Sequence, residues 1–198
     1  MKAFPLYILA GGQSRRFGSD KARATINGRP LIQRIADTLR PAVTSVTVVA
    51  DAAGKYQDLS LPTIPDTAPG SGPLAGLAAA LQHGRNHADC EWVWVVACDW
   101  TNPSLDLLQP LAEQAATTTT AVVYGEQHYQ PFPGLYHYSI QPVVTQHLQC
   151  DKLSMHQLLD DLNGTRVLFH SASKRLMHAN TMDEFAHQIA LSKDTARH

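Results

Sequence analysis

Apolar and polar residues follow one another along the chain in blocks that are typical of short buried strands separated by amphipathic helices. Four apolar or β-branched runs and one shorter candidate bounded by prolines predict strands at Leu6–Leu9, Ser45–Ala50, Trp92–Ala97, Thr119–Tyr124 and Leu61–Pro65. Helical spacing of apolar residues, or an opening proline, predicts helices over Pro30–Leu39, Leu74–Gln82 and Pro103 to about Ala116. Strands that alternate with helices favour an α/β fold, with a mostly parallel sheet and helices on both of its faces.

The pattern changes after Gly125, although a length of 198 residues fits one domain. We therefore treat residues 1–198 as a single domain with a first half, 1–124, and a second half, 125–198. The second half opens with an aromatic, proline-containing segment, Gln130–Tyr138, to which the pattern assigns neither helix nor strand. Two helices, two candidate strands and a last helix are expected after it, at Ser139–Leu148, Ser154–Leu162, Arg166–Phe169, Arg175–Ala179 and from Thr181 onward.

Composition argues against several classes of protein. Hydrophobic residues make up 44% of the chain and charged residues 17%, which is not the balance of a disordered protein. The formal net charge is −1 and no run of lysines or arginines occurs, so we expect no nucleic-acid partner. No apolar run is long enough to cross a membrane, and three cysteines are an odd, sparse set for a disulfide framework. The cytoplasm is the expected location.

The first predicted strand runs directly into a segment suited to binding phosphate. Gly11 to Lys21 contains three glycines, the neighbours Arg15 and Arg16, and an Asp-Lys pair. Ligands of open α/β sheets bind in loops at the carboxyl ends of the strands. Glycines let backbone N–H groups approach phosphate oxygens, and Arg15 and Lys21 can neutralise the charge. The segment matches neither the Walker loop nor the Gly-x-Gly-x-x-Gly dinucleotide motif.

Two aspartates are candidate partners of this loop. Asp99 follows the apolar run Trp92–Ala97, so its carboxylate would project from a rigid strand end and could serve as a hard oxygen ligand for Mg²⁺. Thr101 or Asn102 is expected to cap the helix from Pro103, which leaves Asp99 for the metal. Asp66 precedes a stretch rich in glycine and proline, where a helix cap and a turn are the alternative interpretation.

Histidines give a weaker signal. His83 and His87 have helical i, i+4 spacing and lie near Cys90, but a zinc site needs further ligands that are not evident. Gly84 and Asn86 argue against a continuous helix in this region. We therefore expect no zinc site.

Taken together, these stretches resemble one family of nucleotidyltransferases, the molybdenum cofactor guanylyltransferases. The resemblance rests on the loop Leu9–Lys21, on Asp66 followed by a Gly-Pro-Leu-Ala-Gly run ending at Gly76, and on the strand end at Asp99. Looser matches are Gln130–Tyr136 and Asp151–Ser154. The resemblance covers the chain from Leu9 to about Phe185 and is most specific at the start.

The resemblance implies a Rossmann-like fold of the nucleotide-diphospho-sugar-transferase type and a defined reaction. GMP would pass from GTP to the phosphate of molybdopterin, with Mg²⁺ as cofactor and release of pyrophosphate. GTP and molybdopterin are the expected partners, and molybdoenzyme apoproteins or their chaperones are further candidates. The acceptor phosphate is already anionic near neutral pH, so alignment and charge neutralisation are expected in place of a general base.

Roles in that family are carried over to matching residues. Lys21 and Arg15 would act on the phosphates, and Asp99 would bind the metal. The implied contacts to the guanine and ribose are Leu9, Ala10, Gly11, Gly12, Asp66 and, near the position of a family asparagine, Asp51. The implied contacts to the pterin are Lys152 and Asn180.

Departures from the family pattern leave alternatives open. The family's Asn-x-Asn-Thr becomes His178-Ala179-Asn180-Thr181, which weakens the pterin assignment. One alternative is a transferase that uses CTP or acts on a sugar phosphate; cytidylyl relatives usually have Leu-Ala-Ala-Gly and lack Gly-Pro-Leu-Ala-Gly. Another is a non-catalytic nucleotide-binding protein that delivers the cofactor, against which the intact Lys21 and Asp99 count.

Overall fold

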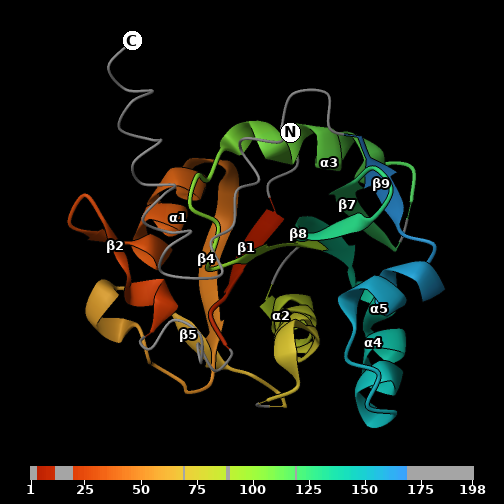
Figure 1. Cartoon of the computed structure of the whole chain (residues 1–198), viewed down its shortest axis with the longest axis horizontal. Helices are drawn as coiled ribbons and strands as arrows, with labels where there is room; N and C mark the ends of the chain where they lie inside the picture. Colours follow the sequence, from red (N-terminus) through yellow and green to blue (C-terminus); the bar gives the residue numbers. More distant parts are fainter. Residues whose placement is uncertain (1–3, 12–19, 69, 88–89, 119, 169–198) are drawn as a thin grey trace.

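The computed structural model describes residues 4–11, 20–68, 70–87, 90–118 and 120–168. Their main feature is a seven-stranded sheet in the order β5-β4-β1-β6-β8-β7-β9 (Figure 1). In chain order its strands are β1 (Phe4–Leu9), β4 (Val43–Ala50), β5 (Thr63–Pro65), β6 (Trp92–Ala97), β7 (Ala121–Gly125), β8 (Tyr129–His137) and β9 (Thr165–Val167). A separate two-stranded hairpin, β2 (Thr25–Ile26) and β3 (Arg29–Pro30), precedes the first long helix. Among the described residues, no helix combines the length and apolar character needed to span a bilayer.

The sheet is mostly parallel, as predicted. β5, β4, β1 and β6 pair in parallel, and β9 is parallel to β7. β8 is antiparallel to both of its neighbours, β6 and β7. The second half of the chain therefore returns to the middle of the sheet.

Strand β8 is the strand of the seven-stranded sheet that the sequence pattern missed. It covers most of the segment Gln130–Tyr138, whose prolines cannot donate a ladder hydrogen bond and so argue against a central strand. The structure accommodates them at an irregularity. Pairing with β7 shifts from Val123 opposite Gly134 to Tyr124 opposite Gln130, so that residues 131–133 fall outside the regular register.

Helices cover both faces of the sheet (Figure 1). One face carries α1 (Leu31–Leu39) and α3 (Leu108–Ala115), and the other carries α2 (Gly72–His87), α4 (Gln141–Gln149) and α5 (Met155–Asp161). Alternate residues of β1 divide between the two layers: Leu6 and Ile8 pack with α1 and α3, whereas Tyr7 and Leu9 pack with α2. Burial on both faces explains why the central strands are continuous apolar runs.

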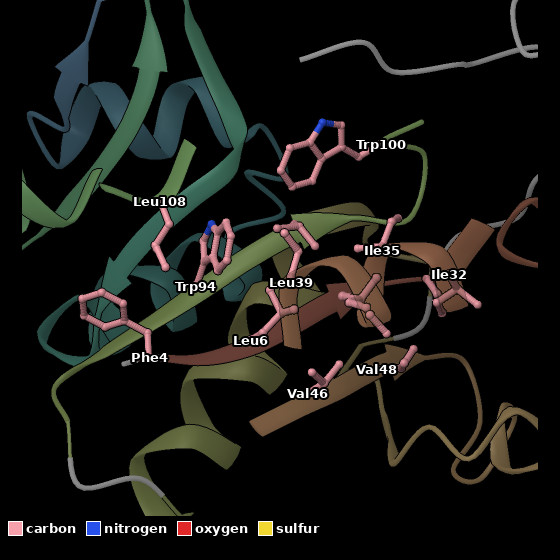
Figure 2. Packing of buried hydrophobic residues seen from close by; sticks show 14 of the residues in the cluster. Phe4, Leu6, Ile32, Ile35, Leu39, Val46, Val48, Trp94, Trp100 and Leu108 are labelled. Carbon is pink, nitrogen blue, oxygen red and sulfur yellow. The ribbon is translucent and has the colours of Figure 1, made fainter. Parts of the chain in front are cut away.

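The layer under α1 shows how the sequence pattern becomes a core. All five apolar positions predicted for the helix are buried, namely Leu31, Ile32, Ile35, Ala36 and Leu39. Figure 2 shows Ile32, Ile35 and Leu39 packed with strand residues such as Leu6, Val46 and Val48. Each of these side chains is at most 5% exposed, so each contributes roughly 1.5–3 kcal/mol of burial free energy before entropy is counted.

Helix α2 corrects one expectation. It continues through Gly84 and Asn86 to His87, where we expected a break. Glycine is present at this helical position because neighbouring side chains pack closely against it. A Cβ built on Gly84 would lie 2.6 Å from the Tyr138 hydroxyl oxygen and 2.8 Å from Val93 Cγ1. The glycine in this helix therefore serves helix-to-sheet contact and does not end the helix.

The helix expected from Pro103 also begins later. The chain first forms a 3-10 turn, η4 (Leu105–Leu107), and α3 starts at Leu108. Ser104 caps this turn, with its side chain accepting from Asp106 N, so the expectation that Thr101 or Asn102 would cap a helix here is wrong. The alternative of Asp99 as the cap is excluded by the same observation.

The two helices expected after residue 138 are present. A 3-10 turn, η5 (Tyr138–Ile140), leads into α4, and Ser154 caps α5 by accepting from Gln157 N. The candidate strand Arg166–Phe169 is found in part as β9, which begins at Thr165 and ends at Val167. The candidate strand Arg175–Ala179 and the helix from Thr181 lie outside the described residues.

Candidate functional site

Four strands end side by side and place the predicted site residues at one edge of the sheet. Leu9, the last residue of β1, is paired with Val49 of β4 and Ala97 of β6, and Ala50 is paired with Pro65 of β5. Backbone hydrogen bonds continue just beyond: Ala10 N to Val49 O at 2.8 Å, Cys98 N to Leu9 O at 3.0 Å and Asp66 N to Ala50 O at 2.7 Å. The residues that follow these strands, namely Gly11, Asp51, Asp66 and Asp99, therefore share the carboxyl edge, the usual ligand site of such sheets.

Lys21 and Asp99 form an ion pair at this edge. Lys21 Nζ lies 3.3 Å from Asp99 Oδ2, although the two residues are 78 positions apart in the chain. Their side chains are only 12% and 22% exposed, so solvent screens the pair less than a surface salt bridge. The structure thus brings together the predicted phosphate-binding cation and the predicted metal ligand.

The backbone on each side of this pair is anchored. Lys21 begins the 3-10 turn η1 (Lys21–Arg23), whose middle residue, Ala22, is buried in the core. Asp20 caps the turn by accepting from Ala22 N at 3.1 Å. On the other side, the buried Trp100 follows Asp99 directly and appears in Figure 2 among the core residues.

Asp66 lies beside Gly11. A Cβ built on Gly11 would be 3.3 Å from Asp66 Oδ2, so glycine leaves open the space next to this carboxylate. Asp66 Oδ1 accepts from Ala68 N at 3.0 Å and thereby forms a local turn. Burial raises the pKa of Asp66, an effect that the hydrogen bond from Ala68 partly opposes.

The glycine-containing run after Asp66 has a packing role as well. A Cβ on Gly76, in α2, would lie 3.1 Å from Leu9 Cδ2. The glycine therefore allows α2 to start close against the end of β1. Leu9 and Ala10 are each 7% exposed, whereas Gly11 is exposed, so of these three residues Gly11 offers the most surface to a ligand.

Asp51 lies at the same edge but has a protein partner. Its carboxylate is 2.8 Å from Lys55 Nζ and its side chain is 60% exposed. The hydrogen bond from Lys55 lowers the pKa of Asp51. A role of Asp51 in binding ribose or base stays a prediction.

Three of the predicted contacts, Gly12, Arg15 and Asn180, lie outside the described residues. Lys152 is exposed on the connection between α4 and α5, and its assignment to the acceptor stays a prediction.

Other chemistry at this edge is limited. Burial raises the pKa of the Cys98 thiol to about 12, so this cysteine is not a nucleophile at neutral pH. Within the part of the chain that the structure describes, no three His, Cys, Asp or Glu side chains are grouped as a metal site. His83 instead bonds through Nδ1 to the Tyr7 hydroxyl at 2.8 Å.

Two residues near the site escaped the sequence reasoning. Tyr56 is completely buried and its hydroxyl lies 3.0 and 3.1 Å from the two carboxylate oxygens of Asp20. Lys55 lies 3.5 Å from the same carboxylate. Nothing in their local sequence marks them, because the contacts join positions 36 and 35 residues apart.

Comparisons with known proteins identify the family of the chain and agree with its fold. Residues 6–166 match the family described as MobA-like NTP transferase domain. A molybdenum cofactor guanylyltransferase of Yersinia pestis is 31% identical over 177 residues, which cover 88% of this chain and 89% of the relative. A probable molybdenum cofactor guanylyltransferase of Carboxydothermus hydrogenoformans is 34% identical over 75% of this chain and 73% of its own. Among solved structures, molybdopterin-guanine dinucleotide biosynthesis protein A of Archaeoglobus fulgidus has the same fold, with a TM-score of 0.82, 20% identity and coverage of 96% of this chain and 100% of its own.

Proposed function

The chain belongs to the family of MobA-like NTP transferase domains, and we propose that it transfers the GMP unit of GTP to the phosphate of molybdopterin. The products are molybdopterin guanine dinucleotide and pyrophosphate. The observation that carries the proposal is the Lys21–Asp99 pair, set at the carboxyl edge where Gly11 and Asp66 also meet. The relatives' names support the same reaction.

The reaction is a substitution at phosphorus. An oxygen of the acceptor phosphate forms a bond to the α-phosphorus of GTP, and the bond from that phosphorus to the α–β bridging oxygen breaks. The bonding electrons leave with pyrophosphate. Because the attacking phosphate is already anionic, the protein must mainly align two anions and neutralise charge.

Lys21 is the described residue best suited to neutralisation. Its ammonium is held on a capped and partly buried turn, so it needs little rearrangement to meet a triphosphate. Arg15 is assigned the same role from the family resemblance alone. The guanine and ribose of GTP would be contacted by the residues at and after the end of β1, namely Leu9, Ala10, Gly11 and Gly12.

A magnesium ion fits the donor set around Asp99. Mg²⁺ is usually held by one or two carboxylates together with substrate phosphates and water, and not by a cage of protein ligands. Asp99 supplies one such carboxylate, and within the described residues no larger acidic cluster competes with it. When bound there, Mg²⁺ would neutralise phosphate charge. Lys21 Nζ, 3.3 Å from Asp99 Oδ2, also compensates the charge of this carboxylate.

Asp66 is the proposed reader of the guanine base. An ionised carboxylate accepts hydrogen bonds from the ring N–H and the exocyclic amine of guanine, a donor pair that cytosine lacks. Asp66 Oδ2 faces the space that Gly11 leaves open. Asp51 is proposed to contribute to the ribose or base from the neighbouring strand end.

The second half of the chain, residues 125–198, is proposed to bind the acceptor. Lys152 would contact the pterin phosphate and Asn180 the pterin ring, and molybdoenzyme apoproteins or their chaperones would receive the product. All three cysteines are free thiols, which agrees with the proposed cytoplasmic location.

The decisive experiment is a turnover assay with the purified chain, Mg²⁺ and molybdopterin. Each of GTP, CTP, ATP and UTP is supplied separately, and the dinucleotide and pyrophosphate are both measured. We expect product with GTP only. Product with CTP would make the chain a cytidylyltransferase, and nucleotide binding without product would support the non-catalytic alternative.

A further inference from the structure

A group of polar contacts joins the Lys21 turn to the segment after β4. Arg23 donates to both carboxylate oxygens of Asp58, at 2.7 and 2.8 Å, and to the backbone oxygen of Lys55 at 2.9 Å. Lys55 Nζ lies 3.5 Å from Asp20 Oδ2. The segment that contains Lys55 and Asp58 therefore contacts the Lys21 turn at several points.

Tyr56 lies at the centre of these contacts. Its side chain is completely buried, and its hydroxyl donates toward both oxygens of Asp20, at 3.1 Å to Oδ1 and 3.0 Å to Oδ2. The guanidinium of Arg23 and the ammonium of Lys55 lie 5.2 and 5.6 Å from the centre of its ring. Burial, together with the negative charge of Asp20, raises the pKa of Tyr56 well above its usual value, so the phenol remains a hydrogen-bond donor at physiological pH.

Asp20 connects this tyrosine to the catalytic edge. Its Oδ1 accepts from Tyr56 and also from Ala22 N at 3.1 Å, so the carboxylate is held from two sides. The next residue, Lys21, is the first residue of the turn that Asp20 caps, so the cap fixes its backbone. Its Nζ lies 3.3 Å from Asp99 Oδ2. A displacement of about 1 Å at a catalytic group can cost roughly 100-fold in rate, so the anchoring of this turn matters for transfer.

The bond between the Tyr56 hydroxyl and Asp20 is partly buried and differs from the exposed ion pairs around it. The side chains of Arg23 and Asp58 are 39% and 58% exposed, so solvent weakens their interaction. The hydroxyl of Tyr56 is attached to a ring that is packed in the core. We therefore expect it to restrain the Asp20 carboxylate more strongly than the exposed ion pairs do.

We propose that Tyr56 is a positioning residue: through Asp20 it holds the Lys21 ammonium in place for the triphosphate. The inference rests on the proposed function, since it names what sets the position of the phosphate-binding cation. Tyr56 touches neither substrate nor metal in this role.

The test compares two tyrosines that differ in what their hydroxyls hold. Tyr56→Phe keeps the ring and removes only the bond to Asp20. Tyr124→Phe is the matched control, because Tyr124 is also buried and its hydroxyl donates to the backbone oxygen of Leu107 at 2.9 Å, and not to the turn that carries Lys21. Similar losses of melting temperature are expected, but only Tyr56→Phe should lower kcat/KM, by about tenfold.

A double-mutant cycle with Lys21→Met separates positioning from general loosening of the fold. If Tyr56 acts through Lys21, adding Tyr56→Phe to Lys21→Met should reduce kcat/KM less than twofold further. The dissociation constant for Mg²⁺-GTP, measured by calorimetry, should show the same non-additivity. Equal losses in both backgrounds, or a Tyr56→Phe enzyme within twofold of wild type, would overturn the proposal.

Asp20→Asn provides a second route if Tyr56→Phe does not fold. The asparagine keeps an oxygen that can accept from Ala22 N, and its amide nitrogen replaces the second oxygen that accepts from the Tyr56 hydroxyl. The double-mutant cycle with Lys21→Met is measured for this variant in the same way. Failure of the proposed function is seen separately, as absence of dinucleotide with the wild-type chain. In that case the GTP-binding cycle alone still decides the role of Tyr56.

Discussion

Replacing Lys21 by methionine should affect catalysis far more than stability. The substitution keeps the length of the side chain and removes its charge. At 3.3 Å and an effective dielectric constant near 20, the attraction to Asp99 is about 5 kcal/mol before desolvation is counted. Because both side chains are largely removed from water, desolvation offsets most of this attraction. Removing only Lys21 leaves the Asp99 charge without this compensation, but Asp99 is 22% exposed and can be hydrated. We therefore expect a loss below the roughly 3–5 kcal/mol typical of a fully buried pair, about 1–2 kcal/mol of unfolding free energy.

The catalytic effect should be larger, because the transition state loses a preorganised cation. Loss of one such donor typically raises the barrier by about 2–4 kcal/mol, which corresponds to a fall in kcat/KM of about 30- to 1,000-fold. The assay is pyrophosphate release with saturating molybdopterin and varied GTP, at a temperature well below the melting point of the variant. Melting curves recorded alongside exclude unfolding as the cause.

Arg29→Met is the control for removing any cation near this turn. Arg29 pairs with Asp37 on the exposed surface, and its side chain is 60% exposed. Loss of that pair should change stability by less than about 1 kcal/mol and leave turnover unchanged. A Lys21→Met enzyme whose kcat/KM is within about threefold of wild type would remove Lys21 from the site.

Four further outcomes are expected. Asp99→Asn should lower turnover at least about 100-fold while the fold survives, and near-normal activity at limiting Mg²⁺ would contradict the metal assignment. Lys152→Ala should raise the KM for molybdopterin about fivefold without changing the GTP dissociation constant, and parallel weakening of both ligands would contradict the division into halves. Gly84→Ala should lower the unfolding free energy by about 1–2 kcal/mol in denaturant titrations, because overpacking against Tyr138 exceeds the gain in helix propensity. Asp66→Asn should weaken GTP binding without lowering the melting temperature at neutral pH.

The parts of the fold predicted correctly are those in which local pattern and tertiary burial agree. Helix α1 buries the five apolar residues that its spacing predicted, and β6 has the bounds of its apolar run. Strand β8 was missed because prolines oppose a central strand, and only the register shift opposite Val123 and Tyr124 accommodates them. Gly84 was misjudged because the sequence does not show that Tyr138 lies against that helix.

The site was predictable as far as it follows from strand ends. Parallel strands finish at one edge, so Asp66 and Asp99 could be placed together with the first loop before any coordinates were known. The contacts made by the neighbouring Asp20 and Asp51 could not be predicted in this way. The Tyr56 hydroxyl bonds to Asp20, which is 36 positions away in the chain, and Lys55 forms an ion pair with Asp51. Both contacts depend on the conformation of the segment that follows β4.

The partly buried carboxyl group of Asp66 is expected to lower the free energy of unfolding at neutral pH while it serves the nucleotide site. Burial is the larger influence on this carboxyl group and raises its pKa in the folded protein. A raised folded-state pKa means that the contribution to stability is greatest in acid, where the group is protonated in both states. That contribution is lost as the pH rises through the unfolded and then the folded pKa. At neutral pH the ionised Asp66 therefore lowers the free energy of unfolding.

Asparagine at position 66 removes this charge and keeps an oxygen that can accept from Ala68 N. The melting temperature of Asp66→Asn should therefore equal or exceed that of wild type at pH 7, and the difference should vanish near pH 3. GTP affinity should fall about tenfold or more, because a hydrogen bond to a charged acceptor contributes about 1.5–3 kcal/mol. Calorimetric melts from pH 3 to pH 8 and GTP titrations measure both effects. A variant that melts lower than wild type at pH 7 would mean that Asp66 makes a net stabilising contribution to the fold, and that its partly buried position is not maintained at the expense of stability.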